Sequence, residues 1–387
     1  MRRAVSRLAR GVVMPVTGAL LVASTGGSVH AQDELKRPKL DHRADTNDWQ
    51  AYYDHGVSLV RRRPAFADRY FEWASKLHPG RAEPLFGRWV AFWMRDLPGL
   101  ARYLKHERGT KLGEGALAAD SMRRLALRRN PFVDQRLEVF LYNELPGRWS
   151  ADPASVAAVR YAERDFGTAA RILADAIDSP QRRRELGYQR ALILVAAGQL
   201  DSAAAELVAL LGALRDADRE FLVGSYYSKA LLEYGLGMVL ATKGDPMGAR
   251  AAFERALVED LAFAPAHEGL GRLALARGDT ATAVRELAQA AELSPAEPYL
   301  RYQYGAALYT ARRMDEALEQ FRRVTSMAPL FADAHFGVAS ARDALGDASG
   351  AAAAYRAYLE RAPRTATAAR SQAEQRLAAL SATPTRP

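Results

Sequence analysis

Apolar residues recur three and four positions apart along most of the chain beyond residue 40, which predicts a series of amphipathic helices. Short breaks separate these helices, and several breaks consist of a glycine followed by an aspartate: Gly244-Asp245, Gly278-Asp279 and Gly346-Asp347. The glycine suits the left-handed end of one helix, and the aspartate suits the N-cap of the next. The pattern therefore predicts helices joined in pairs by tight turns.

The pairs recur with a period of 34 residues. The period links a set of alanines, a set of large apolar residues, a set of glycines and a set of helix-ending prolines: Ala249, Ala283, Ala317 and Ala351; Phe253, Leu287, Phe321 and Tyr355; Gly237, Gly271 and Gly305; Pro295, Pro329 and Pro363. The small residues fall on faces that neighbouring leucines mark as buried. We expect paired helices to approach each other closely at these positions.

This 34-residue helical hairpin resembles the tetratricopeptide repeat, which places Leu-Gly in the first helix, Ala and an aromatic in the second, and Pro near the end. Residues 230–363 carry the resemblance through Leu270-Gly271, Tyr304-Gly305, Ala317, Phe321 and Pro329. Three positions depart from it: Leu261 for the proline, Arg312 for the turn glycine and Ala339 for the first-helix glycine. The resemblance implies an all-α fold, an α-solenoid of helix-turn-helix repeats.

The same pattern divides the whole chain. We expect a signal peptide over 1–31, a basic, Trp-rich helical region with degenerate hairpins over 32–150, the repeat array over 151–363, a capping helix over 364–380 and a disordered tail over 381–387. Twelve extra residues, centred on 215–220, should lengthen a helix or form a loop. Ala67 and Phe71 fit the repeat, so residues 32–150 belong either to one array of up to nine hairpins or to a separate helical domain.

Residues 1–31 combine four arginines and no acid with an apolar run over 12–23 and small residues before Gln32. This order predicts a cleaved secretory signal, a periplasmic or secreted mature protein and no transmembrane span within it. A mitochondrial presequence and an uncleaved anchor are the alternatives. The unbroken apolar run argues against the first, and its shortness against the second.

Charge and chemistry narrow the function. The chain has a formal net charge of +9, and residues 32–150 hold 22 Lys and Arg against 16 Asp and Glu. The absence of cysteine excludes disulfides, thiol catalysis and cysteine-bound metals. No nucleophile, phosphate-binding or metal-binding motif occurs, so we expect no enzyme activity, cofactor or metal, and an exported protein is not expected to bind nucleic acid. A hydrolase with an unrecognised site in residues 40–150 is a minor alternative.

A concave surface is the expected working site, because in the resembled family the first helix of each repeat lines a groove that holds a protein or peptide partner. The groove residues predicted here are Tyr234, Met238, Glu268, Arg272, Tyr299, Tyr302, Tyr309, Asp333, Phe336, Ser340 and Asp343. The aromatic members could anchor a partner or could pack between repeats. The Lys and Asn that clamp a chain-end carboxylate in that family are absent from these positions.

A second candidate surface lies in the first third, where all five tryptophans occur. Trp89 and Trp93 are one helical turn apart and alternate with Arg88 and Arg95. Exposed, these side chains could stack on the sugars of a glycan or envelope polymer. Core packing of the tryptophans is the competing interpretation.

Overall fold

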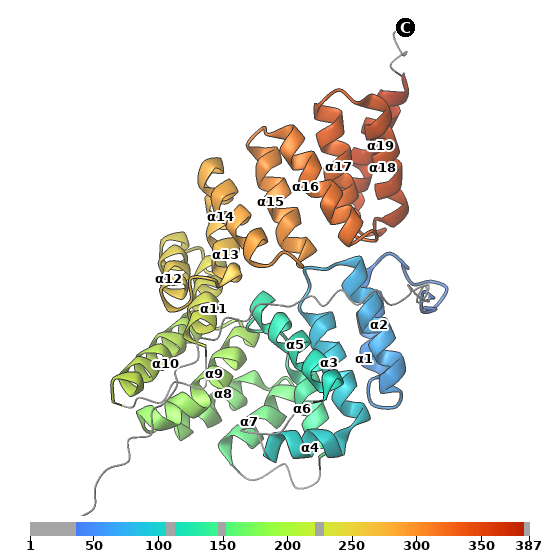
Figure 1. The fold of residues 1–387 in the computed structure, drawn as a ribbon. Coiled ribbons are helices and arrows are strands. Elements are labelled where there is room, and N and C mark those ends of the chain that lie inside the picture. The colour runs from blue at the N-terminus through green and yellow to red at the C-terminus, as the bar shows by residue number, and fades with distance from the viewer. Residues whose placement is uncertain (1–35, 106–112, 146–151, 221–227, 383–387) are drawn as a thin grey trace, which may run out of the picture. The chain divides into compact units, whose positions relative to one another are not determined.

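A computed structural model describes residues 36–105, 113–145, 152–220 and 228–382 of the chain. The described residues form helices and turns without a strand, so the predicted all-α fold is confirmed. From Pro38 onward the chain forms one compact unit. Its helices follow one another as drawn in Figure 1: α1 Trp49–Leu59, α2 Pro64–Leu77, α3 Glu83–Arg95, α4 Leu97–Lys105, α5 Glu114–Arg129, α6 Arg136–Asn143, α7 Pro153–Ala162, α8 Phe166–Ala176, α9 Pro180–Ala196, α10 Leu200–Glu220, α11 Lys229–Thr242, α12 Pro246–Glu259, α13 Ala264–Ala276, α14 Thr280–Leu293, α15 Pro298–Thr310, α16 Met314–Met327, α17 Ala332–Ala344, α18 Ala348–Arg361 and α19 Thr367–Ala382.

The helices from α7 to α18 pair as hairpins, and successive hairpins pack on one another (Figure 1). The expected solenoid is therefore present, and α19 packs on α18 as the expected final helix. The disordered tail was predicted to begin at residue 381, but Ser381 and Ala382 still belong to α19. The rest of that tail lies outside the described residues, as does the predicted signal segment.

The turns between paired helices have the predicted conformation. Gly244, Gly278 and Gly346 have φ of 83°, 76° and 81°, and the aspartate after each glycine accepts a hydrogen bond from a backbone N–H of the next helix. Arg312 takes the glycine place in the turn between α15 and α16 with φ of 62°. The departure of Arg312 from the repeat pattern thus preserves the turn but places a Cβ in the left-handed region.

Arg312→Gly should raise the free energy of unfolding by about 0.5–1 kcal/mol, because a residue with a Cβ costs roughly 1–2 kcal/mol in this conformation and glycine loses more entropy on folding. Among the described residues, the exposed Arg312 side chain forms no hydrogen bond or ion pair that the change would remove. Chemical denaturation measures the change. As a control, Arg277→Gly, at a turn residue with φ of −98°, should destabilise the protein; equal effects of both changes would contradict the argument.

Small residues lie where helices touch, as the sequence predicts. The ring of Phe321 is held between Gly305 and Gly337, and a Cβ added to either glycine would come within 2.9 Å of that ring. In the first hairpin, Phe71 lies between Gly56 and Gly87, where an added Cβ would come within 2.8 Å. The hairpin of α1 and α2 therefore has the packing of the C-terminal repeats.

Residues 83–143 depart from that packing. Helix α3 packs chiefly against α2 and α5, and in the described chain neither α3 with α4 nor α5 with α6 forms the close pair of a repeat hairpin. The degenerate hairpins expected near residues 82–147 are thus replaced by a different helix arrangement. Helix α10 runs for 21 residues against 14 in α12 and α14, so about seven of the twelve extra residues lengthen it. Among the described helices none is both long and apolar enough to cross a bilayer.

Candidate groove site

The predicted groove residues lie on the first helices of four successive hairpins, α11, α13, α15 and α17, but they differ in exposure. Tyr234 is 2% exposed and its ring contacts Phe253 and Phe263. Glu268 is also buried, whereas the Arg272 side chain is 62% exposed. Tyr234 and Glu268 therefore form the wall of the site, and Arg272 can reach a partner directly.

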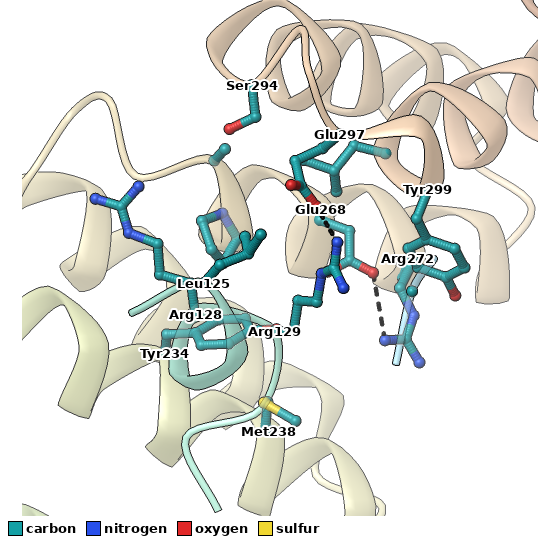
Figure 2. Close-up of a pocket in the computed structure, with 14 residues that line it drawn as sticks. Leu125, Arg128, Arg129, Tyr234, Met238, Glu268, Arg272, Ser294, Glu297 and Tyr299 are labelled. Carbon is teal, nitrogen blue, oxygen red and sulfur yellow. Dashed lines mark hydrogen bonds and ion pairs between the residues drawn. The ribbon is translucent and has the colours of Figure 1, made fainter. Parts of the chain in front are cut away.

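A cavity of about 150 Å³ opens where α5 meets these first helices, and Figure 2 shows its lining. We call it the groove pocket. The repeats contribute five of the predicted groove residues, and the first third of the chain contributes a further wall that the sequence pattern did not predict. The lining comprises Gly80, Leu125, Arg128, Arg129, Tyr234, Met238, Ala264, Pro265, Glu268, Arg272, Ser294, Glu297, Tyr299 and Leu300.

Helix α5 brings two adjacent arginines to the pocket, and they have different surroundings. Arg129 pairs with Glu297 at 2.5 Å and donates to the backbone carbonyl of Arg81 at 3.0 Å, so its charge is already neutralised. Arg128 lies 5.9 Å from the ring centre of Phe263, and no carboxylate of the described residues pairs with it. Arg128 thus leaves a positive charge available at the rim.

The other end of the pocket also carries an arginine, Arg272. Arg272 approaches Glu268 at 3.6 Å, beyond hydrogen-bonding distance for that pair of atoms (Figure 2). Burial raises the pKa of Glu268, an effect that Arg272 partly opposes. Arg272 therefore forms a long ion pair with Glu268, and its exposed guanidinium keeps donors for an incoming acidic group.

Two aromatic groove residues pack against the rings of other helices. Tyr302 contacts the rings of Phe321 and Phe331, and Phe336 contacts Tyr355 and Tyr358. This packing favours the interpretation that these side chains join neighbouring repeats. Truncating them would test stability as well as binding.

The remaining predicted groove residues lie on or next to α15 and α17. Asp343 is bound at 2.7 and 2.8 Å by Arg376 of α19, which lowers the pKa of the aspartate. Asp333 is exposed at the start of α17, and the other two, Tyr309 and Ser340, are half-buried. Asp343 thus holds the capping helix, while a partner role for the others stays a prediction.

The second candidate surface lacks the exposed indoles that it requires. Trp89 and Trp93 are each 3% exposed and belong to the core of the first third. Arg88 pairs with Asp68 at 2.8 Å, and Arg95 is exposed at the end of α3. The tryptophans are buried because α3 packs against α2 and α5, so the core interpretation holds for this pair.

No group of three or more His, Asp and Glu side chains with metal-binding geometry occurs within the described ranges. His78, beside the groove pocket, is half-buried next to the cation of Arg81, and together these effects lower its pKa to about 4. The histidine is therefore neutral near pH 7 and packs as an aromatic ring. The site offers charge, hydrogen bonds and apolar surface for binding.

Hairpins, turn glycines and buried aromatics define a helical repeat scaffold, a class consistent with protein–protein interaction. Residues 234–298 and 302–366 match the family model of the tetratricopeptide repeat. The chain therefore carries tetratricopeptide repeats over these residues.

One curated relative is a TPR repeat-containing protein, PA4299, of Pseudomonas aeruginosa, 42% identical over 90 residues. The match covers 23% of this chain and only 35% of that relative. Among solved structures, YrrB, described as a TPR protein with an unusual peptide-binding site, is 22% identical with a TM-score of 0.42, over 52% of this chain and 97% of YrrB. MamA from Desulfovibrio magneticus is 18% identical with a TM-score of 0.40, over 46% of this chain and 94% of MamA.

Proposed function

We propose that this chain is an exported scaffold of the cell envelope that holds a segment of a protein partner in the groove pocket. The observation that carries the proposal is the pair of arginines at the two ends of the pocket. Arg128 pairs with no carboxylate of the described residues, and Arg272 is exposed and forms only a 3.6 Å ion pair with Glu268. Between them lie apolar side chains, among them Leu125 and Met238. A segment with acidic residues flanking an apolar residue complements this lining.

The first helices of the repeats support the same assignment, since concave repeat surfaces are commonly used to bind extended partners. An enzyme is not proposed, because the site holds no activated nucleophile or paired acid and base. A polymer-binding role is not proposed either, because the two central tryptophans are buried.

A peptide library displayed on phage and selected on the immobilised mature chain tests the groove. The selected peptides should be enriched in Asp and Glu, and Arg128→Ala combined with Arg272→Ala should weaken their binding about tenfold, equivalent to about 1.4 kcal/mol. The matched control removes two exposed arginines of second helices, Arg250 and Arg323, each of which pairs with a glutamate on its own helix. Equal losses in both double variants would show general charge attraction and would contradict the site.

Export is proposed from the pattern of residues 1–31. Mass spectrometry of the protein from its host envelope should find a mature N-terminus at Gln32. A chain that retains Met1 and fractionates with the cytoplasm would overturn the export proposal and leave the groove proposal standing.

A further inference from the structure

The first hairpin touches the far end of the repeat array through an aromatic contact. Tyr299 lies against Gly80, where an added Cβ would come 2.5 Å from the tyrosine ring. The neighbouring ring of His78 lies 6.0 Å from Tyr299 and 5.5 Å from Phe331, measured between ring centres. The turn after α2 therefore covers the α15 face of the groove.

Polar contacts surround this aromatic centre. The side-chain amide of Asn47 donates to the carbonyl of Glu360 at 2.8 Å, and the guanidinium of Arg364 donates to the carbonyl of Arg43 at 2.9 Å. The backbone N–H of Arg364 also donates to the carboxylate of Asp45. On the groove side, the Arg129–Glu297 ion pair joins α5 to the turn before α15 (Figure 2).

The contact is narrow compared with the packing inside the array. Among the described helices, extensive packing joins only helices up to three apart in chain order, so α1 and α2 reach the last repeats through turns. Asn47 and Arg364 bond near the surface, where each such contact contributes on the order of 0–1 kcal/mol. Small interfaces between parts of one chain commonly open and close.

We propose that the first hairpin, α1 and α2 with the turns on either side, is an intramolecular occupant of the groove and that a partner displaces it to reach the α15 face. This inference rests on the proposed function, because it names the regulation of the same site. The covered face holds Tyr299, against which the turn after α2 packs through Gly80 and His78. Release would uncover this aromatic ring beside the groove pocket. The partner would bind only molecules whose groove is open. Its apparent affinity would therefore fall in proportion to the fraction of molecules in the open state.

The chain has no cysteine, so introduced cysteines report on this contact alone. Asp45→Cys with Arg364→Cys places two thiols at this contact, where the Asp45 carboxylate accepts from the backbone N–H of Arg364, and a disulfide between them should form while the contact is closed. Gly80→Leu should push the hairpin away from Tyr299 and slow disulfide formation about tenfold. Gly113→Leu is the control, because a Cβ there meets nothing within 4 Å. Equal disulfide rates in the Gly80→Leu and Gly113→Leu backgrounds would overturn the proposal without any partner being known.

Binding separates the two proposals. With a phage-selected groove peptide as the probe, the oxidised Asp45→Cys/Arg364→Cys chain should bind about tenfold more weakly than the same chain after reduction. Gly80→Leu should bind more tightly than Gly113→Leu. If the peptide binds all these forms equally, the groove proposal stands and the proposal that the first hairpin occupies the groove fails. If selection yields no groove peptide while Gly80→Leu slows the disulfide, the closed contact stands and the partner proposal fails.

Discussion

Phe321→Ala should lower the free energy of unfolding by about 3–5 kcal/mol, the usual range for removing a buried aromatic ring. Phe321 is 3% exposed and fills the space between Gly305 of its own repeat and Gly337 of the next. Since neither glycine has a side chain to move into the gap, the cavity would persist and its cost would be high. Urea denaturation measures the change, and hydrogen exchange should locate the loss in α15 to α18.

Phe321→Leu is the control that the chain itself supplies. Leu287 fills the equivalent position one repeat earlier, where it lies within 2.5 Å of a Cβ added to Gly271. The leucine variant should therefore cost only about 1 kcal/mol. A leucine variant as unstable as the alanine variant would show that ring shape, and not filled volume, holds the repeats together.

The local geometry of the repeats was predictable because each feature depends on residues close in sequence. Asp279 caps α14 by accepting a hydrogen bond from the backbone N–H three residues later. Gly278 follows α13 with positive φ, as the glycine-aspartate pattern indicates. A residue type that departs from the pattern can still keep the geometry, as Arg312 shows. The limit of the pattern was the outer end of α19: the apolar periodicity stops at Leu380, whereas the helix runs on to Ala382, close to Pro384.

The groove pocket was predictable only in part, because half of it depends on contacts between distant segments. The repeat register places Glu268 and Arg272 on the inner side of α13, but no periodicity indicates that Arg129 meets Glu297, 168 residues later. The only sequence signal for this wall was the excess positive charge of the first third. A net charge does not indicate which residues it will contact in the fold.

The prediction of an exposed tryptophan surface is wrong for a related reason. Alternation of Trp89 and Trp93 with arginines suggests an exposed aromatic face when α3 is taken alone. In the fold α3 packs against several helices, and Arg123 lies 5.0 Å from the ring centre of Trp89 within the core of the first third. Cations next to aromatic rings can thus mark a packed interior as well as a binding face.

The extension of helix α10 bonds to the two helices that follow it in the chain. Arg215, within this insertion, donates to Glu233 of α11 at 2.7 Å and to Glu259 of α12 at 2.9 Å. Arg255 of α12 donates to both oxygens of Glu233 at 3.0 Å. The insertion therefore ties three helices together at the start of the matched repeats through one fully buried carboxylate.

Glu233→Ala should lower the free energy of unfolding by about 3 kcal/mol, because removing one partner of a buried ion cluster strands the opposite charges. The value falls at the low end of the usual range because Arg215 and Arg255 keep about 35% and 44% of their side chains exposed. Glu254→Ala is the matched control on α12: its pair with Arg250 is equally short, at 2.7 Å, but half of each side chain is exposed. Loss of that exposed pair should cost at most about 0.5 kcal/mol. Equal losses for Glu233→Ala and Glu254→Ala in urea denaturation would show that burial of the cluster does not hold α10 to the array.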